Sequence, residues 1–216
     1  QPLEPGQPYS LDVFRPADAR GIARLYYGAY GEHFPIDYVY DPAAIVARNA
    51  SGDVRHLVAR TERGDVVGIG ALFYSAPTRV LMEMGAFIVD PAYPGGRLVL
   101  KLAQITGEEL PREIGLQAVL SQAVCDHLVT QKPQQRHGYR PFAIELAALP
   151  ERRADRQFGV SGRISLLDGM RLFRDQPQTL FLPERYAAWL TDFYAARGLQ
   201  RRFERDTGPD GKTLDL

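Results

Sequence analysis

The sequence has 216 residues, of which 45% are hydrophobic and 24% are charged, a composition typical of a globular protein with at least one full domain. Lys and Arg number 26 and Asp and Glu also number 26, so the charge balance indicates neither nucleic acid nor an anionic membrane as a partner. The single cysteine, Cys125, excludes an intrachain disulfide and a zinc site built on cysteines.

The sequence contains no apolar run near the ~20 residues of a membrane span, and its start lacks a basic-then-apolar signal peptide. We therefore expect a cytoplasmic protein that does not enter a membrane. Residues 1–8 are rich in Pro and Gly and lack an initiator Met. That composition is typical of a linker or a trimmed end, which would make this chain one domain of a longer protein.

Periodicity and turn signals predict an alternation of helices and strands. Asp41-Pro42, for example, opens a helix with a capping carboxylate followed by Pro in the first turn. In chain order, the predicted elements are a strand at Tyr9–Arg15, a helix at Ala17–Tyr30, the helix from Asp41, strands at His56–Thr61, Val66–Tyr74 and Val80–Asp90, a helix at Arg97–Ile114, a strand at Leu116–Val124, a helix at Thr130–His137 and a strand at Phe142–Ala148. This order predicts a mixed α/β fold over residues 9–150.

Residues 151–216 are predicted to form a C-terminal β/α extension packed on the first domain. Its expected elements are strands at Gly162–Arg174 and Thr179–Leu182, a helix at Pro183–Gly198, and edge strands at Arg202–Asp206 and Lys212–Leu216. We expect this extension either to cover the active site or to form a homodimer contact.

The predicted element order resembles that of the GNAT superfamily of N-acetyltransferases. The stretches that carry the resemblance are Arg15-Pro16-Ala17-Asp18-Ala19, Gly64-Asp65-Val66-Val67-Gly68, Glu83 to Pro91, Gly138-Tyr139, and Ala123-Val124-Cys125-Asp126-His127 followed by Thr130-Gln131-Lys132. The last of these looks like a divergent bacterial branch of the superfamily. The resemblance implies a GNAT-like fold, acetyl-CoA or another acyl-CoA as co-substrate, no metal, and a small-molecule or protein amine as acceptor.

The resemblance also implies where the co-substrate lies. Amides of the fourth strand, at Phe87, Ile88 and Val89, would face its pantetheine arm, and the turn and helix start at Gly95, Gly96, Arg97 and Leu98 would hold its pyrophosphate. A Gly-rich turn before a helix suits an anion because the turn amides and the positive end of the helix dipole both favour negative charge.

The glycine pattern of this turn departs from the family. The family's turn motif, Arg/Gln-x-x-Gly-x-Gly/Ala, aligns with residues 94–99. Pro94, Arg97 and Val99 occupy its three defining positions. Pro94 removes an amide donor, and the other two side chains would crowd a pyrophosphate. Two outcomes stay open: a shifted loop in which Gly95 and Gly96 provide the close approach and Arg97 pairs with phosphate, or a degenerate loop that no longer binds CoA.

Two residues are candidates for acid–base chemistry. Glu83 lies where some GNAT enzymes place a general base, and strand alternation turns it away from Met82 and Met84 toward the substrate side. Apolar neighbours would raise its pKa, which suits a base near neutral pH; an ion-paired surface Glu is the alternative. His127 follows the fifth strand and is either an acid or base or a loop histidine bonded to backbone.

The family's usual general acid is a Tyr four residues before the Gly-Phe at the end of the last helix. Gly138-Tyr139 fixes that register, and the position holds Gln134. The aromatic residues between the first two helices cover the acceptor in the family, and Tyr30, Phe34 and Tyr38 are therefore candidate substrate residues, with core packing as the alternative.

Three functions remain open from the sequence. The first is an acyl-CoA-dependent N-acyltransferase, most simply an N-acetyltransferase, that uses direct attack by a bound amine with Glu83 as base. The second is a GNAT-fold binding or sensing module that has lost CoA chemistry, as the altered turn and the absent Tyr suggest. The third is transfer from an acyl carrier protein, which would tolerate an altered turn and dock near Arg97 and Lys101.

Overall fold

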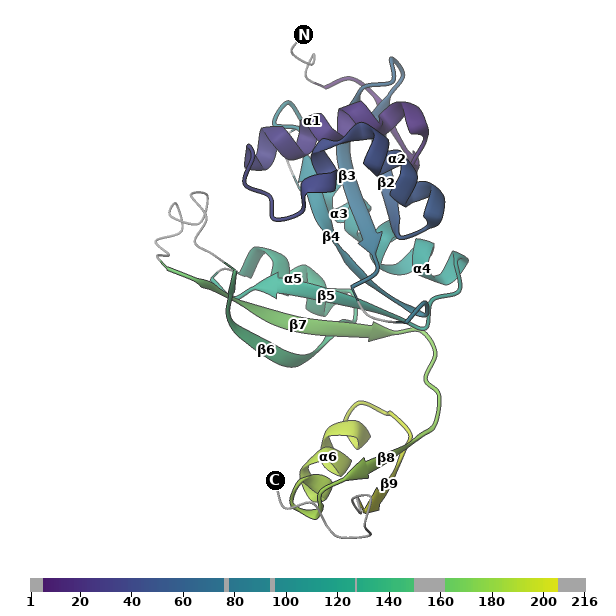
Figure 1. Cartoon of the computed structure of the whole chain (residues 1–216), viewed down its shortest axis with the longest axis vertical. Helices are drawn as coiled ribbons and strands as arrows, with labels where there is room; N and C mark the ends of the chain where they lie inside the picture. The colour runs from purple at the N-terminus through teal and green to yellow at the C-terminus, as the bar shows by residue number, and fades with distance from the viewer. Residues whose placement is uncertain (1–5, 76–77, 94–95, 127, 150–161, 206–216) are drawn as a thin grey trace. The chain divides into compact units, whose positions relative to one another are not determined.

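The structure is a computed structural model that describes residues 6–75, 78–93, 96–126, 128–149 and 162–205 (Figure 1). The chain divides into two compact units, Gln1–Leu172 and Phe173–Leu216. The strands and α-helices are β1 (Tyr9–Val13), α1 (Ala19–Tyr30), α2 (Pro42–Ser51), β2 (Val54–Thr61), β3 (Val66–Phe73), β4 (Leu81–Val89), α3 (Arg97–Gln104), α4 (Leu110–Glu113), β5 (Ala118–Val124), α5 (Leu128–Arg136), β6 (Arg140–Leu149), β7 (Ile164–Leu172), β8 (Gln178–Leu182), α6 (Glu184–Ala195) and β9 (Arg201–Arg205).

The larger unit is built on one seven-stranded sheet in the order β1-β2-β3-β4-β5-β7-β6. Its pairs are antiparallel except for the central pair β4–β5, which is parallel. Helices cover both faces, α1 and α2 on one and α3 on the other (Figure 1). This confirms the predicted mixed α/β fold class.

Two buried apolar clusters fix the helices to the sheet. On one face, Ile22 of α1 and Ile45 of α2 pack against β-strand residues such as Ile69, and all three are fully buried. On the other face, Leu98 and Leu102 of α3 pack against the opposite side of β2 and β3. The strands β2 and β3 are therefore buried on both faces, which explains why they read as nearly continuous apolar runs.

The predicted start of α2 is confirmed in detail. The Asp41 carboxylate accepts a hydrogen bond from the Ala43 amide at 2.9 Å, and Pro42 is the first helical residue. The helix ends at Gly52, which adopts the left-handed conformation with a φ of 76°. Local sequence signals thus set both ends of this helix.

The strand β7 belongs to a different unit from the one predicted from the sequence. The sequence predicts that its residues belong to the C-terminal extension, beyond residue 150. In the structure β7 lies between β5 and β6 in the sheet of the larger unit, and its partners on β5 run from Ala118↔Leu172 to Val124↔Leu166. The main sheet is therefore completed by a strand that follows residues 150–161.

The smaller unit has a β-α-β arrangement. The strands β8 and β9 pair in parallel from Gln178↔Arg201 to Leu182↔Arg205, and α6 connects them. The predicted strand at Lys212–Leu216 lies outside the described residues. The predicted packing of residues 151–216 on the first domain stays a prediction.

The helix predicted over Arg97–Ile114 is interrupted by a π-helical turn at Ile105–Glu109 between α3 and α4. Pro111 has no backbone N–H and so cannot bond the Gly107 carbonyl four residues earlier. The Tyr139 hydroxyl donates to that carbonyl instead, at 3.1 Å. Tyr139 is 2% exposed, so it ties the helix to the end of α5 as a structural residue.

A buried ion pair connects the start of α1 to β2. Arg60 donates from Nε to Asp18 Oδ1 at 2.6 Å and from Nη2 to Asp18 Oδ2 at 2.5 Å. Asp18 is 3% exposed and Arg60 8%. Asp18 also accepts a hydrogen bond from the Arg15 amide at 2.7 Å, so its carboxylate is satisfied on both sides.

A buried histidine makes the stability of the fold dependent on pH. His56 on β2 is 2% exposed, and burial lowers its pKa from 6.5 to about 4. Its Nδ1 contacts the Asn49 amide side chain, and Nε2 has no hydrogen-bond partner among the described residues. The folded protein therefore holds this imidazole neutral.

We expect the free energy of unfolding to fall as the pH drops from about 6.5 toward 4. In that window the unfolded chain protonates His56 and the folded chain does not, so protons favour unfolding, by on the order of 3 kcal/mol in total. Urea unfolding at a series of pH values measures this, and His56→Gln should flatten the curve between pH 6.5 and 5. His33→Gln, at an exposed histidine, is the control and should keep the pH dependence of the wild-type free energy of unfolding. The same pH dependence in His56→Gln as in the wild type would contradict the assignment to His56.

Candidate active site

The strand β4 carries a β-bulge at its centre. Ile69 of β3 lies opposite Ile88, and Ala71 lies opposite Gly85, so Gly70 faces the two residues Ala86 and Phe87. Ala86 has a φ of 55°, a left-handed conformation that is rare for a residue with a side chain. A Cβ on Gly70 would lie 2.8 Å from a ring carbon of Phe87, so glycine is required there.

The two central strands separate beside this bulge. β4 and β5 pair from Leu81↔Ala118 to Met84↔Ser121, and the pairing ends there although both strands continue. Peptide groups of β4 beyond Met84 therefore have no ladder partner on the β5 side. Such groups need a hydrogen-bonding partner, which an extended ligand lying along the strand can supply.

The start of α3 lies after the carboxyl end of β4. The first backbone bond of this helix runs from the Leu100 amide to the Gly96 carbonyl at 2.9 Å, so the amides of residues 97–99 have no partner within the helix. Gly96 and Arg97 are exposed, and a Cβ on Gly96 would meet no atom of the described residues within 4 Å. The helix start is thus open to an anion.

The side chains of the remaining residues predicted to bind the co-substrate mostly pack into the apolar clusters on either face of the sheet. Phe87 and Val89 pack on the α3 side of the sheet, and Ile88 is buried on the α1 side. Leu98 is 3% exposed and belongs to the core under α3. Gly95 lies outside the described residues, and the roles of this set stay predictions.

Glu83 lies on the α1 face of β4, because its neighbours Met82 and Met84 are buried on the other face. Burial raises the pKa of the Glu83 carboxyl, and the negative charges of Asp168 and Glu145 raise it further, whereas a hydrogen bond from Ser75 lowers it in part. A carboxylate with a raised pKa is suited to accept a proton near neutral pH.

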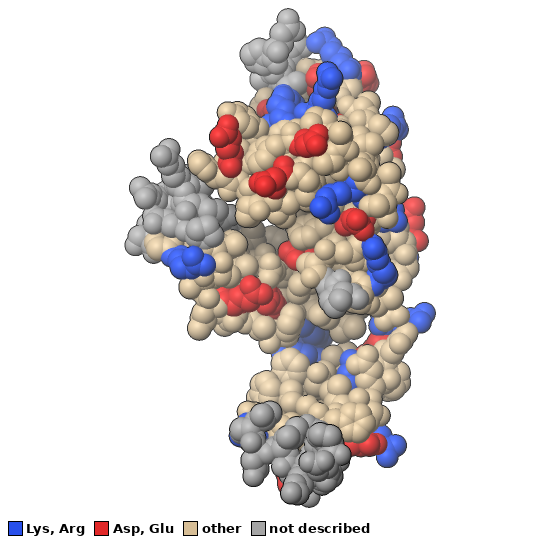
Figure 2. Space-filling model, in the orientation of Figure 1, with Lys and Arg blue, Asp and Glu red and all other residues tan. Residues whose placement is uncertain are grey.

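Asp168 and Glu145 extend the acidic character of this face across β7 and β6. The Gln122 amide of β5 joins them, because Nε2 lies 3.1 Å from an oxygen of each carboxylate. Asp168 is 5% exposed. Figure 2 shows acidic side chains exposed on this part of the larger unit, where a cationic group would be attracted.

Gln134 is buried at the position where the family carries its acid. Its Nε2 donates to the Ser121 carbonyl at 2.6 Å, at the last paired residue of β5. The amide lies over Gly169 of β7, where a Cβ would come within 2.7 Å of Nε2. Gln134 can donate a hydrogen bond at the separation of the strands, but it has no titratable proton.

The predicted acceptor residues fall into two groups. Tyr30 and Phe34 stack on one another at 4.9 Å and pack against the α1 core. Tyr38 also packs against this core and in addition lines a pocket, with the Arg48 guanidinium 4.4 Å from its ring centre. His127 lies outside the described residues. The assignment of these residues to a site stays a prediction.

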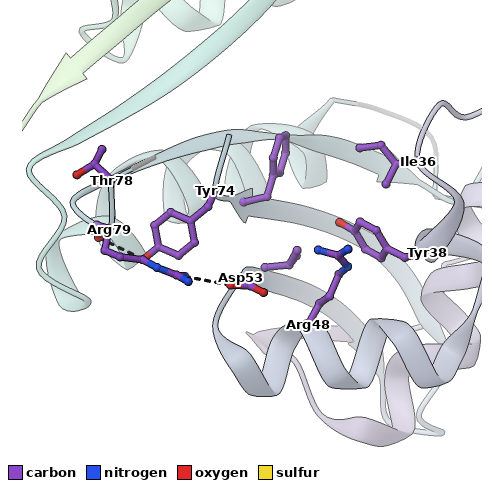
Figure 3. Close-up of a pocket in the computed structure, with 9 residues that line it drawn as sticks. Ile36, Tyr38, Arg48, Asp53, Tyr74, Thr78 and Arg79 are labelled. Carbon is purple, nitrogen blue, oxygen red and sulfur yellow. Dashed lines mark hydrogen bonds and ion pairs between the residues drawn. The ribbon is translucent and has the colours of Figure 1, made fainter. Parts of the chain in front are cut away.

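The pocket has a volume of ≈ 550 Å³ and lies between α2 and the neighbouring ends of β2 and β3 (Figure 3). Ile36, Val54 and Phe73 form its apolar walls. Figure 3 shows Tyr38 and Arg48 at one side and Arg79 at the other, with an ion pair from Arg79 Nη1 to Asp53 at 3.0 Å.

Sequence reasoning missed Arg48, Phe73 and Asp168. For Asp168 a signal exists, because alternation along β7 puts this carboxylate on the same face as the buried Ile164 and Leu166. A charged residue at an inward position is uncommon unless it has a function or a partner. Arg48 and Phe73 gave no such signal, because they come together only where α2 packs against β2, whose first residue Val54 pairs with Phe73.

Among the described residues, no group of three or more His, Cys, Asp or Glu side chains is placed to hold a metal ion. Within the same part of the chain, no helix combines the length and apolar character needed to cross a membrane.

No family model and no curated protein matches this sequence. Solved structures do match its fold. They include the ribosomal-protein-alanine N-acetyltransferase of Brucella melitensis, with 18% identity, a TM-score of 0.60 and coverage of 76% of this chain and 99% of that chain. They also include an N-acetyltransferase of Staphylococcus aureus, with 14% identity, a TM-score of 0.60 and coverage of 78% and 100%.

A third match is the GNAT phosphinothricin acetyltransferase of Sinorhizobium meliloti, solved in complex with acetyl-CoA. Its identity is 16%, its TM-score is 0.59, and the match covers 76% of this chain and 88% of that chain. These N-acetyltransferases share the fold of this chain, which therefore has the GNAT fold.

Proposed function

We propose that the protein is an acyl-CoA-dependent N-acyltransferase, and most simply an N-acetyltransferase, that acts on an amine. The observation that carries this proposal is the bulge at Ala86–Phe87 beside the end of β4–β5 pairing, which leaves β4 amides unpaired next to an open helix start at Gly96. The similar solved structures include N-acetyltransferases, and the one from Sinorhizobium meliloti was solved with acetyl-CoA.

The residues present fit acetyl-CoA. The amides at the start of α3 and the exposed Arg97 would hold the pyrophosphate, and the unpaired β4 amides beyond Met84 would hold the pantetheine arm. A thioester supplies a carbonyl that a neutral amine can attack. Because Pro94, Arg97 and Val99 stand at the three defining positions of the usual motif, Arg97 would be the charged partner of the phosphates.

Glu83 would take the proton that the acceptor amine must lose, directly or through one water. The raised pKa of Glu83 supports this role because it makes the carboxylate a stronger base than an ordinary glutamate, and the hydrogen bond from Ser75 holds the carboxylate in place. Gln134 would donate a hydrogen bond near the separated strands without delivering a proton. We therefore propose a mechanism in which the departing thiolate receives no proton from a Tyr.

We expect calorimetric titration with acetyl-CoA to show micromolar binding that Arg97→Glu weakens by roughly ten-fold or more, because the change replaces a phosphate partner with a repelling charge. Free CoA should behave similarly. Arg55→Glu is the matched control, since Arg55 is exposed near the opposite end of the sheet, and it should bind as the wild type does.

Absence of heat with acetyl-CoA at high concentration would contradict the proposal. A GNAT-fold binding or sensing module, or an acyltransferase that takes its donor from an acyl carrier protein, would then be the better reading. Titration with an acylated carrier protein separates these two, because only the second predicts binding that depends on Arg97 and Lys101.

A further inference from the structure

The pocket between α2 and the ends of β2 and β3 carries one surplus positive charge. Among its described lining residues, Arg48 and Arg79 are the cations and Asp53 is the one acid. Asp53 is engaged by Arg79, because the guanidinium lies 3.0 Å from its carboxylate and stacks over the Tyr74 ring at 4.5 Å. The pocket therefore retains the charge of Arg48.

Arg48 is held in place without an ion pair. Its guanidinium lies over the Tyr38 ring at 4.4 Å, and no carboxylate of the described residues comes within ion-pair distance of it. A stacked guanidinium loses little freedom when it binds, and its planar set of donors matches a carboxylate. Figure 3 shows Arg48 beside Tyr38 at the wall of the pocket.

The pocket adjoins the proposed base through β3. Phe73 lines the pocket and lies directly opposite Glu83 in the β3–β4 pair, so the two side chains share one face of the sheet. The Phe73 ring also lies over Gly85, where a Cβ would come within 3.2 Å of it. Ser75, two residues further along, hydrogen-bonds Glu83. Glu83 thus neighbours the residue that forms one apolar wall of the pocket.

We propose that this pocket binds the acceptor and that Arg48 pairs with a carboxylate at the end of the acceptor remote from its reacting amine. This inference rests on the proposed function for the amine end, which lies toward Glu83. The apolar walls Ile36, Val54 and Phe73 fit a hydrocarbon segment between the two ends. The substrate class is therefore an amine joined to a carboxylate through an apolar chain, and neither a simple alkylamine nor a polyamine.

Chemical-shift titrations of the isotope-labelled protein test the proposal with three probes of one chain length: 6-aminohexanoate, hexylamine and 1,6-diaminohexane. The wild type should bind 6-aminohexanoate roughly ten-fold more tightly than hexylamine, because only the first offers a charged partner to Arg48. Arg48→Gln should abolish this preference. Arg48→Glu should reverse it in favour of the diamine, and the exposed Arg55→Glu should behave as the wild type does. Shorter and longer ω-amino acids then define the separation of the two ends.

Acyl transfer is read separately, as thiol release from acetyl-CoA in the presence of each probe. The proposal is overturned if hexylamine supports the same rate of thiol release as every ω-amino acid and Arg48→Glu does not change these rates. That result would leave the acyltransferase function standing. Failure of every ω-amino acid to bind would also overturn it. Arg48-dependent binding without any acetyl-CoA binding would instead refute the acyltransferase and keep Arg48 as a carboxylate site.

Discussion

Glu83→Gln is expected to lower the rate of acyl transfer by about 10²- to 10⁴-fold, the usual contribution of a positioned general base. The variant keeps the shape and the hydrogen-bonding capacity of the side chain but cannot accept the proton of the amine. Binding of acetyl-CoA should stay unchanged, because Glu83 lies on the α1 face of β4, away from the start of α3. Thiol release at saturating acetyl-CoA, together with calorimetry, measures both effects.

The dependence of the rate on pH gives a second test of Glu83 as the general base. Burial first, and then Asp168 and Glu145, raise the pKa of Glu83, so the fraction of active base should rise with pH at values above the ordinary ~4.3 of a glutamate. The acidic limb of the wild-type profile should therefore lie above that value and disappear in Glu83→Gln. An identical limb in the variant would assign the titration to another group.

Two controls separate catalysis from folding. Glu145→Gln removes an exposed carboxylate on the same face and should change the rate only slightly. The raised pKa of Glu83 means that its ionised form is disfavoured in the folded state, so a neutral Gln should not destabilise the protein at pH 7. A large loss of stability in Glu83→Gln would contradict this placement.

Asp18→Ala is expected to lower the free energy of unfolding by about 3–5 kcal/mol, the cost of leaving a buried charge without its partner. Asp18 and Arg60 are both nearly inaccessible and are joined by two hydrogen bonds. Since domains of this size have only about 5–15 kcal/mol of stability, the variant would lose a large share of it. Urea unfolding, with a check that the slope is unchanged, measures the loss.

Asp12→Ala is the matched control. Asp12 also lies near Arg60, at 3.7 Å, but its carboxylate is 36% exposed, so the loss should be at most about 1 kcal/mol. Adding Arg60→Met to Asp18→Ala should recover part of the stability, because the unpaired charge is removed. Equal losses in Asp18→Ala and Asp12→Ala would show that burial of the pair does not decide its contribution.

Local signals in the sequence were sufficient for most of the secondary structure. The capping carboxylate of Asp41, the Gly52 stop and the β-branched runs of β2 and β3 act within a few residues, so the ends of these elements follow from neighbours along the chain. The alternation of Met82, Glu83 and Met84 likewise determined which face each side chain takes. The fold class followed from the order of the elements.

The tertiary structure decided what depends on residues far apart in the chain. The bulge at Ala86–Phe87 depends on Gly70, the π-helical turn depends on Tyr139 reaching Gly107, and the sheet is completed by β7 from beyond residue 150. The sequence by itself thus determined the elements, the Glu83 face and the Gly-rich start of α3, because short-range backbone preferences set them. The Asp18–Arg60 pair came only from the fold, because long-range packing brings these two charges together and takes them out of water. The Arg48 pocket also came only from the fold, because it joins residues 36–54 to residues 73–79.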